Sequence, residues 1–183
     1  MSDVVVRIRG LEVGGRHGVH EAERVLGQRF VVDIDMVLAH DRSTTTDDLA
    51  DTVDYAMQLK QAHWNVKGRQ FVALHEMFDE MTAQAQEYAD LMAERAVMLG
   101  GQALGTLQAA AKSTQLPEYP LQARAAAEHL TALADRLAVL AASVRAAIDT
   151  TDDLGDKDTA DLFTEISRGL DKQMWYLEAH LED

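Results

Sequence analysis

From residue 46 onward, apolar residues recur every three or four positions almost to the end of the chain. This spacing predicts four amphipathic helices, over about 46–63, 69–99, 121–148 and a last stretch ending near Leu181. Thr46 and Asp47 are suitable capping residues, so the first helix is expected to start near residue 47. Helices of about 20 to 30 residues are about 30 to 45 Å long. Four of them predict a mainly α protein built as a four-helix bundle.

The first 40 residues have a different pattern. Val4–Ile8 and Phe30–Leu38 are rich in β-branched residues and partly alternate apolar with polar side chains, which is typical of strands. Glycines at 14, 15, 18 and 27 separate them, as glycines do in turns. The sequence therefore predicts a β-rich segment before the bundle.

Charge and composition exclude several classes of function. The 183 residues carry a formal net charge of −14 and no cysteine, which excludes disulfides, zinc–thiolate sites, iron–sulfur clusters and cysteine nucleophiles. The negative charge argues against a partner bound through its phosphates and favours cations. No run of eighteen apolar residues and no secretory leader is seen, so we expect a soluble cytoplasmic protein without a membrane partner.

Possible metal ligands lie on the first two predicted helices. His63 lies near the end of the first, while His75 and Asp79, and Asp90 and Glu94, are pairs four residues apart on the second. Residues at i and i+4 share a helix face, so each pair can offer two ligands. Imidazole with carboxylates suits iron, manganese or zinc.

The two pairs are too far apart to share one ion within one chain. Asp79 and Asp90 are separated by eleven residues, or about 16 Å along a helix, whereas a metal–ligand bond is about 2 Å. If the pairs cooperate, a second subunit must lie antiparallel, related by a two-fold axis. The site would then exist only in a dimer.

Spacing alone leaves other interpretations open. A carboxylate four residues after a histidine is common on solvated helix faces, and His75–Asp79 also resembles the HExxH helix of zinc proteases, with aspartate in place of the second histidine. The Glu-x-x-His pattern of ordinary di-iron bundles is absent from the sequence. Lys60 lies on the apolar face of the first helix and is expected to keep its charge at the edge of the core.

Residues 56–183 resemble the Dps-type mini-ferritins, ferritin-like proteins that protect DNA in starved bacteria. The resemblance covers about 70% of the chain, in the family's order, and its matching stretches are Lys60–Gly68, Phe71–Asp79, Asp90–Ala96, Leu99–Gly101 and Asp158–Trp175.

The resemblance implies a ferroxidase site on His63, His75 and Asp79 of one subunit and Asp90 and Glu94 of its mate. It also implies a dodecameric shell that oxidises Fe(II), preferentially with hydrogen peroxide, and stores Fe(III). Trp64 would match the family's tryptophan that intercepts oxidising by-products, and its alternative is a core aromatic. The acidic turn with Asp152, Asp153 and Asp156 would either attract Fe(II) to a pore or cap the final helix.

Residues 1–55 resemble instead the start of dihydroneopterin aldolase, through Ile8–Leu11, His17–Arg24, Gly27–Asp33 and Asp47–Tyr55. Glu23 and Tyr55 would match active-site positions of that family, but its later glutamate and lysine are absent, so aldolase activity is not expected. The resemblance implies a fusion near Tyr55 and Ala56.

The lysine-rich tail with which some mini-ferritins bind DNA is missing, since residues 1–55 hold six basic and eleven acidic residues. Direct DNA binding is therefore expected to be weak or absent, and the bacterial nucleoid is the alternative to a location in the cytoplasm. The alternative function is a non-catalytic shell or nucleoid-associated protein with an impaired metal site.

Overall fold

The computed structural model describes residues 4–15, 28–38 and 42–182, with side chains from Asp47 onward. Contacts divide the chain into two units, Met1–Asp41 and Arg42–Asp183. The helix that opens the second unit crosses the sequence junction predicted near residue 55. That junction stays a prediction. Gly18, Gly27 and Glu23 lie outside the described residues.

The first unit is an antiparallel pair of strands, β1 (Val4–Gly15) and β2 (Gln28–Leu38). The pairing runs from Val4 opposite Leu38 to Gly15 opposite Gln28, with an irregularity between Ile8 and Leu11. The two strands cover the two β-branched runs seen in the sequence. A two-stranded hairpin is common to many folds, so it does not identify an aldolase.

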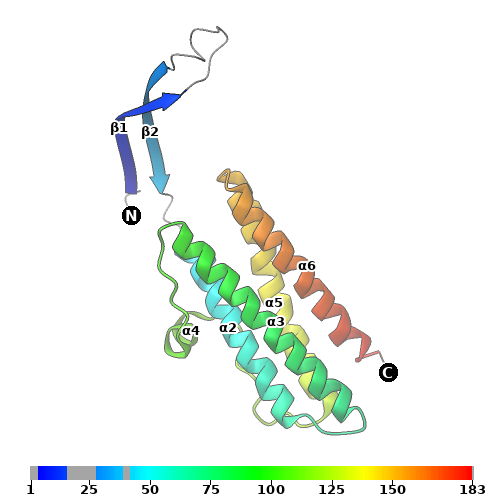
Figure 1. Cartoon of the computed structure of the whole chain (residues 1–183). Helices are drawn as coiled ribbons and strands as arrows, with labels where there is room; N and C mark the ends of the chain where they lie inside the picture. The colour runs from blue at the N-terminus through cyan, green and yellow to red at the C-terminus, as the bar shows by residue number, and fades with distance from the viewer. Residues whose placement is uncertain (1–3, 16–27, 39–41, 183) are drawn as a thin grey trace. The chain divides into compact units, whose positions relative to one another are not determined.

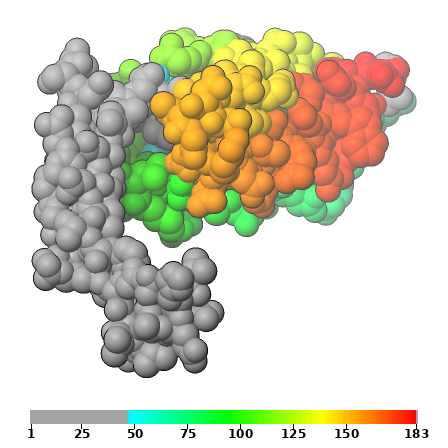
Figure 2. Space-filling view, turned by 90° about the horizontal axis from the view of Figure 1, so that it is seen from above, coloured from blue at the N-terminus to red at the C-terminus, as the bar shows by residue number. Residues whose placement is uncertain are grey.

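The second unit consists of α2 (Arg42–Asn65), α3 (Phe71–Met98), the short α4 (Leu107–Ser113), α5 (Ala126–Asp153) and α6 (Lys157–Ala179). α2 lies along α3, and α5 along α6 (Figure 1). The last two lie side by side in the space-filling view (Figure 2). The bundle of four long helices predicted from the apolar spacing is confirmed. Among the described residues no helix has the length and apolar character needed to cross a membrane.

Several predicted boundaries were wrong. α2 begins at Arg42 rather than near residue 47, so Thr46 and Asp47 lie inside the helix instead of capping it. α5 begins at Ala126 rather than Leu121. At this start, Glu128 accepts hydrogen bonds from the backbone amides of Arg124 and Ala125, the two residues before the helix. The helix also continues through Asp153, so the acidic turn is shorter than expected. α4 was not predicted.

The core joins all four long helices. Apolar side chains near the middle of each long helix are buried. On α3, the first and last residues of the apolar face, Phe71 and Val97, are exposed. The largest fully buried side chains are Tyr55, Phe78, Phe163, Leu59, Leu74, Met92, Leu130, Leu133, Leu137, Leu140, Ile166 and Leu170. Tyr55 shows that the front of α2 contributes to the bundle core.

Candidate metal centre

His63 and His75 face each other across the turn that joins α2 to α3. Nδ1 of His63 lies 2.7 Å from the carbonyl oxygen of His75, and Nδ1 of His75 lies 2.8 Å from the carbonyl oxygen of His63. The two rings stack with centroids 3.7 Å apart and an interplanar angle of 17°. The carbonyl of His63 is free for this contact because it belongs to the last turn of α2, where no later amide of the helix completes the ladder.

These hydrogen bonds determine which ring nitrogens can bind a metal. A backbone carbonyl only accepts, so Nδ1 must carry the proton in both rings. In the neutral rings, Nε2 then keeps its lone pair. Metal-binding histidines are commonly oriented in this way, by a carbonyl that holds the other ring nitrogen. Two imidazole donors are therefore fixed beside each other, each with one nitrogen available.

Asp79 adds a carboxylate one turn after His75. It is 53% exposed and forms an ion pair with Lys60, which is 27% exposed. The hydrogen bond from Lys60 is the largest cause of the lowered pKa of Asp79, and the nearby His63 and His75 lower that pKa further. The charged carboxylate therefore lies close to both imidazoles, with Lys60 as its partner. The contact with Lys60 was not anticipated from the sequence, although the helical spacing had put the lysine at the edge of the core.

Trp64 is exposed, with 62% of its surface accessible. The interpretation of this residue as a core aromatic was therefore wrong. Val72, at the start of α3, is exposed to the same fraction. An indole next to His63 in sequence thus faces outward from the isolated chain.

Asp90 and Glu94 are exposed on the second half of α3 and do not join the histidines. Among residues 47–182, no group of three or more potential metal ligands comes together. The single chain thus brings His63 and His75 together, leaves Asp79 nearby in its ion pair with Lys60, and keeps Asp90 and Glu94 apart from them. This is the arrangement required if a second subunit supplies the missing ligands.

The acidic turn has a structural role. Asp156 caps α6 by accepting a hydrogen bond from the amide of Thr159 and pairs with Arg95 at 2.7 Å. Asp152 pairs with Lys157. The capping interpretation is confirmed for Asp156, and two of the three carboxylates are already engaged by cations.

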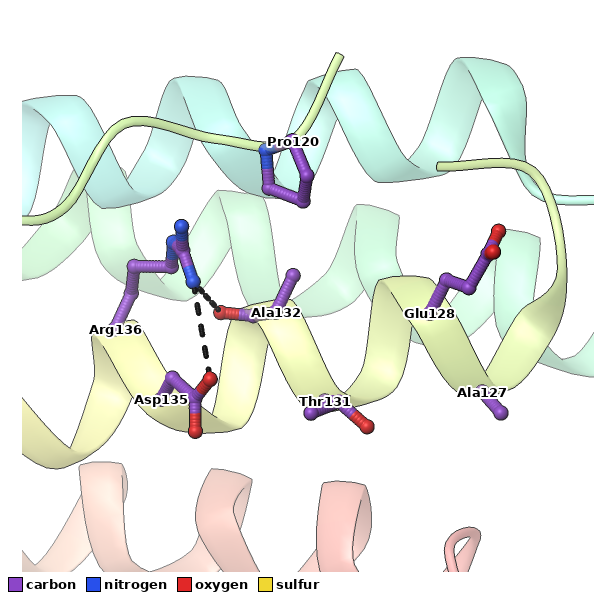
Figure 3. A pocket seen from close by; sticks show the side chains of 7 residues that line it. All are labelled: Pro120, Ala127, Glu128, Thr131, Ala132, Asp135 and Arg136. Carbon is purple, nitrogen blue, oxygen red and sulfur yellow. Dashed lines mark hydrogen bonds and ion pairs between the residues drawn. The ribbon is translucent and has the colours of Figure 1, made fainter. Parts of the chain in front are cut away.

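A groove of about 550 Å³ on α5 and the loop before it was not anticipated. In Figure 3, Arg136 reaches back to the carbonyl of Ala132 and to Asp135 on the same helix. Its lining residues are Pro120, Ala127, Glu128, Thr131, Ala132, Asp135 and Arg136. With one guanidinium and two carboxylates it has no set of metal ligands, and it contains none of the residues predicted for the site.

The bundle is similar to known proteins in sequence and in fold. A family model described as a ferritin-like domain matches residues 45–183. The DNA protection during starvation protein of Agrobacterium fabrum is 48% identical over 135 residues, covering 74% of this chain and 83% of that protein.

Solved structures are similar too. The Dps protein from Bacillus brevis has a TM-score of 0.72 and 33% identity, covering 75% of this chain and 92% of that one. Dps from Microbacterium arborescens in its high iron form has a TM-score of 0.71 and 34% identity, covering 76% and 91%. The matched residues 45–183 contain every residue of the candidate centre. From the family model and the identity to the Agrobacterium fabrum protein we conclude that the chain belongs to the ferritin-like family, among the Dps proteins.

Proposed function

We propose that this protein is a mini-ferritin that oxidises Fe(II), preferably with hydrogen peroxide, and stores the ferric product in a hollow shell, thereby protecting DNA. The observation that carries this proposal is the reciprocal pair of His63 and His75, which leaves two Nε2 donors beside the carboxylate of Asp79. Two imidazoles and a carboxylate suit Fe(II).

The site is completed by a second copy of the chain. Asp90 and Glu94 are exposed and four residues apart on α3, so they form a carboxylate pair on one helix face. A two-fold axis that sets two copies antiparallel would bring this pair to the histidines of the partner. We propose a shell of twelve subunits built from such dimers.

Within this site the residues have separate roles. Nε2 of His63 and of His75 would bind Fe(II) together with Asp79, while the carboxylates of the second copy neutralise the charge of the ion. Lys60 has to release Asp79 as the ion enters, since one charged carboxylate oxygen cannot serve both cations equally well. Two Fe(II) ions give up one electron each, and hydrogen peroxide with two protons becomes two water molecules. The exposed Trp64 would intercept oxidising by-products.

DNA protection would follow from removal of Fe(II) and peroxide rather than from direct contact. The net charge of −14 opposes binding to a polyanion. We therefore propose weak or absent DNA binding for a protein of the bacterial cytoplasm, with a place at the nucleoid as the alternative.

Residues 1–55 are proposed to derive from an aldolase-like segment, and this proposal rests on the sequence resemblance alone. The last part of that segment, Asp47–Tyr55, is helical and buries Tyr55 and Leu49 in the bundle unit. Nothing in this arrangement favours aldolase activity, because the segment serves as the front of α2.

One observation favours a second candidate, a non-catalytic shell protein. Lys60 forms an ion pair with Asp79 in the single chain. If this ion pair does not open, Asp79 cannot bind iron and the metal site is impaired. Aerobic addition of Fe(II) and peroxide separates the two functions. Ferric absorbance should appear with the wild type and be lost in a variant with H63Q and D79N.

Matched controls exist on α6 and just after it. H180Q alters a histidine at the C-terminal end of α6, and D171N alters an exposed aspartate paired with Arg145. Both should keep the activity. Light scattering after size exclusion should give a mass of about twelve subunits, since ferritin-like shells are closed symmetric oligomers. A dodecamer without ferric absorbance would favour the non-catalytic shell.

A further inference from the structure

Tyr119 and His129 form a hydrogen-bonded pair that iron oxidation as proposed above does not use. The phenolic oxygen of Tyr119 lies 2.6 Å from Nδ1 of His129. Tyr119 is half-buried in the loop before α5, and His129 is fully buried in the first turn of that helix. Burial lowers the pKa of His129, so the ring is neutral at pH 7.

The phenolic hydroxyl determines the direction of this hydrogen bond. Burial outweighs the opposing effect of the Asn65 backbone on the pKa of His129, and Nε2 of the ring has no hydrogen-bond partner. Nδ1 of His129 is the partner that the described residues offer to the protonated phenol. With the neutral ring protonated on Nε2, the hydroxyl of Tyr119 donates to Nδ1.

The pair lies at the same end of α2 as the candidate metal centre. Asn65, whose backbone acts on the pKa of His129, follows His63 and Trp64 directly in α2. A parallel bridge between Lys67 and Ala125 also joins the loop after α2 to the residue before α5. The imidazole of His129 therefore borders the backbone that carries His63 and Trp64.

Charge around Tyr119 favours oxidation coupled to proton loss. The guanidinium of Arg136 lies 6.0 Å from the centre of the tyrosine ring, and this positive charge disfavours a tyrosine cation radical. Burial raises the pKa of the Tyr119 hydroxyl, against the smaller effect of Arg136, so the phenol is protonated at neutral pH. Removing an electron from this ring thus requires a base for the phenolic proton, and His129 already holds it.

We infer that Tyr119 and His129 form a one-electron donor that quenches strong oxidants released beside the iron site. The inference rests on the proposed function for its oxidant, the hydroxyl radical formed when one Fe(II) reduces peroxide. Tyr119 gives one electron to that radical, which becomes hydroxide, and its O–H bond breaks as the proton moves to Nδ1 of His129. The products are a neutral tyrosyl radical, an imidazolium and hydroxide.

The test uses the full-length protein without iron, so that it does not depend on ferroxidase activity. Flash-generated ruthenium(III) tris-bipyridine replaces the hydroxyl radical, and electron paramagnetic resonance measures the tyrosyl radical. We expect a radical in the wild type and its loss in Y119F. In H129Q, which keeps an acceptor but removes the base, radical formation should slow about tenfold or more, because the proton-transfer contribution is lost.

Y55F is the matched control. Tyr55 is also buried, but its hydroxyl has no hydrogen-bond partner, so its removal should leave the signal unchanged. A signal that persists in Y119F, or that disappears in Y55F, would overturn the inference. In the wild type, electron–nuclear double resonance after exchange into D2O should detect one deuteron at hydrogen-bond distance from the radical oxygen, and its absence would also count against the pair.

Reaction with Fe(II) and peroxide then separates this inference from the proposed function. Ferric absorbance together with the Tyr119 radical supports both. Ferric absorbance without the radical would overturn the role of the pair in iron oxidation. A photochemical radical without any ferric absorbance would instead overturn the proposed function and leave the pair as an oxidisable site.

Discussion

Lys60 on α2 and Asp79 on α3 form an ion pair next to the two stacked imidazoles of His63 and His75. The carboxylate proposed as an iron ligand is therefore engaged by a cation in the single chain. Both side chains are partly accessible, and accessible ion pairs are weak because water and salt screen them. An ion pair of that strength can open when a divalent cation arrives.

Replacing Lys60 with glutamine should strengthen binding of Fe(II). The variant removes a positive charge beside the site and frees the carboxylate of Asp79, so we expect the dissociation constant to fall by up to about fivefold, the upper end of what an exposed charge pair supports. Anaerobic calorimetric titration with Fe(II) measures it. K157Q is the control, since Lys157, the first residue of α6, also pairs with an aspartate, Asp152 near the end of α5. Weaker binding in K60Q would mean that the lysine orients Asp79 productively.

Mixing two inactive variants should restore activity if the site spans two chains. One variant would carry H63Q and H75Q, and the other D90N and E94Q. A mixed dimer has one site with both defects and one with neither. Because half of the dimers are mixed after random reassembly by a two-fold axis, ferric absorbance should recover to about a quarter of the wild-type rate.

The measurement compares rates before and after the two proteins are dissociated and reassembled together. Each variant treated alone in the same way is the control and should stay inactive. No recovery in a mixture that has the wild-type mass would contradict the two-chain site.

Regular patterns predicted most of the bundle, whereas its exceptions depend on contacts made in three dimensions. The central apolar positions of α3 and α5 follow the helical period and are buried. The start of α5 does not follow that period, because Pro117 and Pro120 precede it and Glu128 caps it. Glu128, which accepts hydrogen bonds from the amides just before α5, was the sequence signal for the start of this helix.

The candidate centre could be predicted as a set of residue types but not as a geometry. Spacing put His75 and Asp79 on one helix face. The reciprocal bonds between His63 and His75, twelve residues apart, depend on the turn between α2 and α3. The direction of Trp64 likewise depends on which face of α2 meets the core. The seven residues of α4 are too few to show a helical period, so the cap at Thr106 was the local signal for this helix.

Gly169 should not tolerate a side chain. A Cβ atom at this position of α6 would lie 1.7 Å from the hydroxyl oxygen of Tyr88 on α3, so the buried Tyr88 ring or the two helices would have to move. Alanine normally favours a helix over glycine by about 1 kcal/mol, yet we expect G169A to lower the free energy of unfolding by about 1–3 kcal/mol through overpacking. Urea unfolding followed by circular dichroism measures the change.

A second substitution tests the cause. Y88F removes the atom closest to the added Cβ, so G169A combined with Y88F should recover part of the lost stability. If the double variant loses as much free energy of unfolding as the two single variants lose together, the clash with Tyr88 is not the source of the loss.

Asp48 should make the bundle less stable as pH rises. The residue is fully buried on α2; one oxygen accepts a hydrogen bond from Ser143, and the other has no partner. Burial, helped by the nearby Asp51 and Asp47, raises the pKa of Asp48 to about 6. Since the folded state holds the proton more tightly than the unfolded chain, stability is greatest below about pH 4, decreases up to about pH 6 and is constant above it.

Asparagine at this position should therefore stabilise the protein at neutral pH. D48N keeps the acceptor for Ser143 and removes the charge, and the rise of the Asp48 pKa from 3.8 to about 6 corresponds to a gain of about 3 kcal/mol at pH 7. Scanning calorimetry at fixed protein concentration should show a higher midpoint at pH 7 and little difference at pH 4. D135N, which alters an exposed aspartate on α5, should change neither value. If D48N lowers the midpoint at pH 7, the charged carboxylate stabilises the front of α2, and the inferred cost of its burial is wrong.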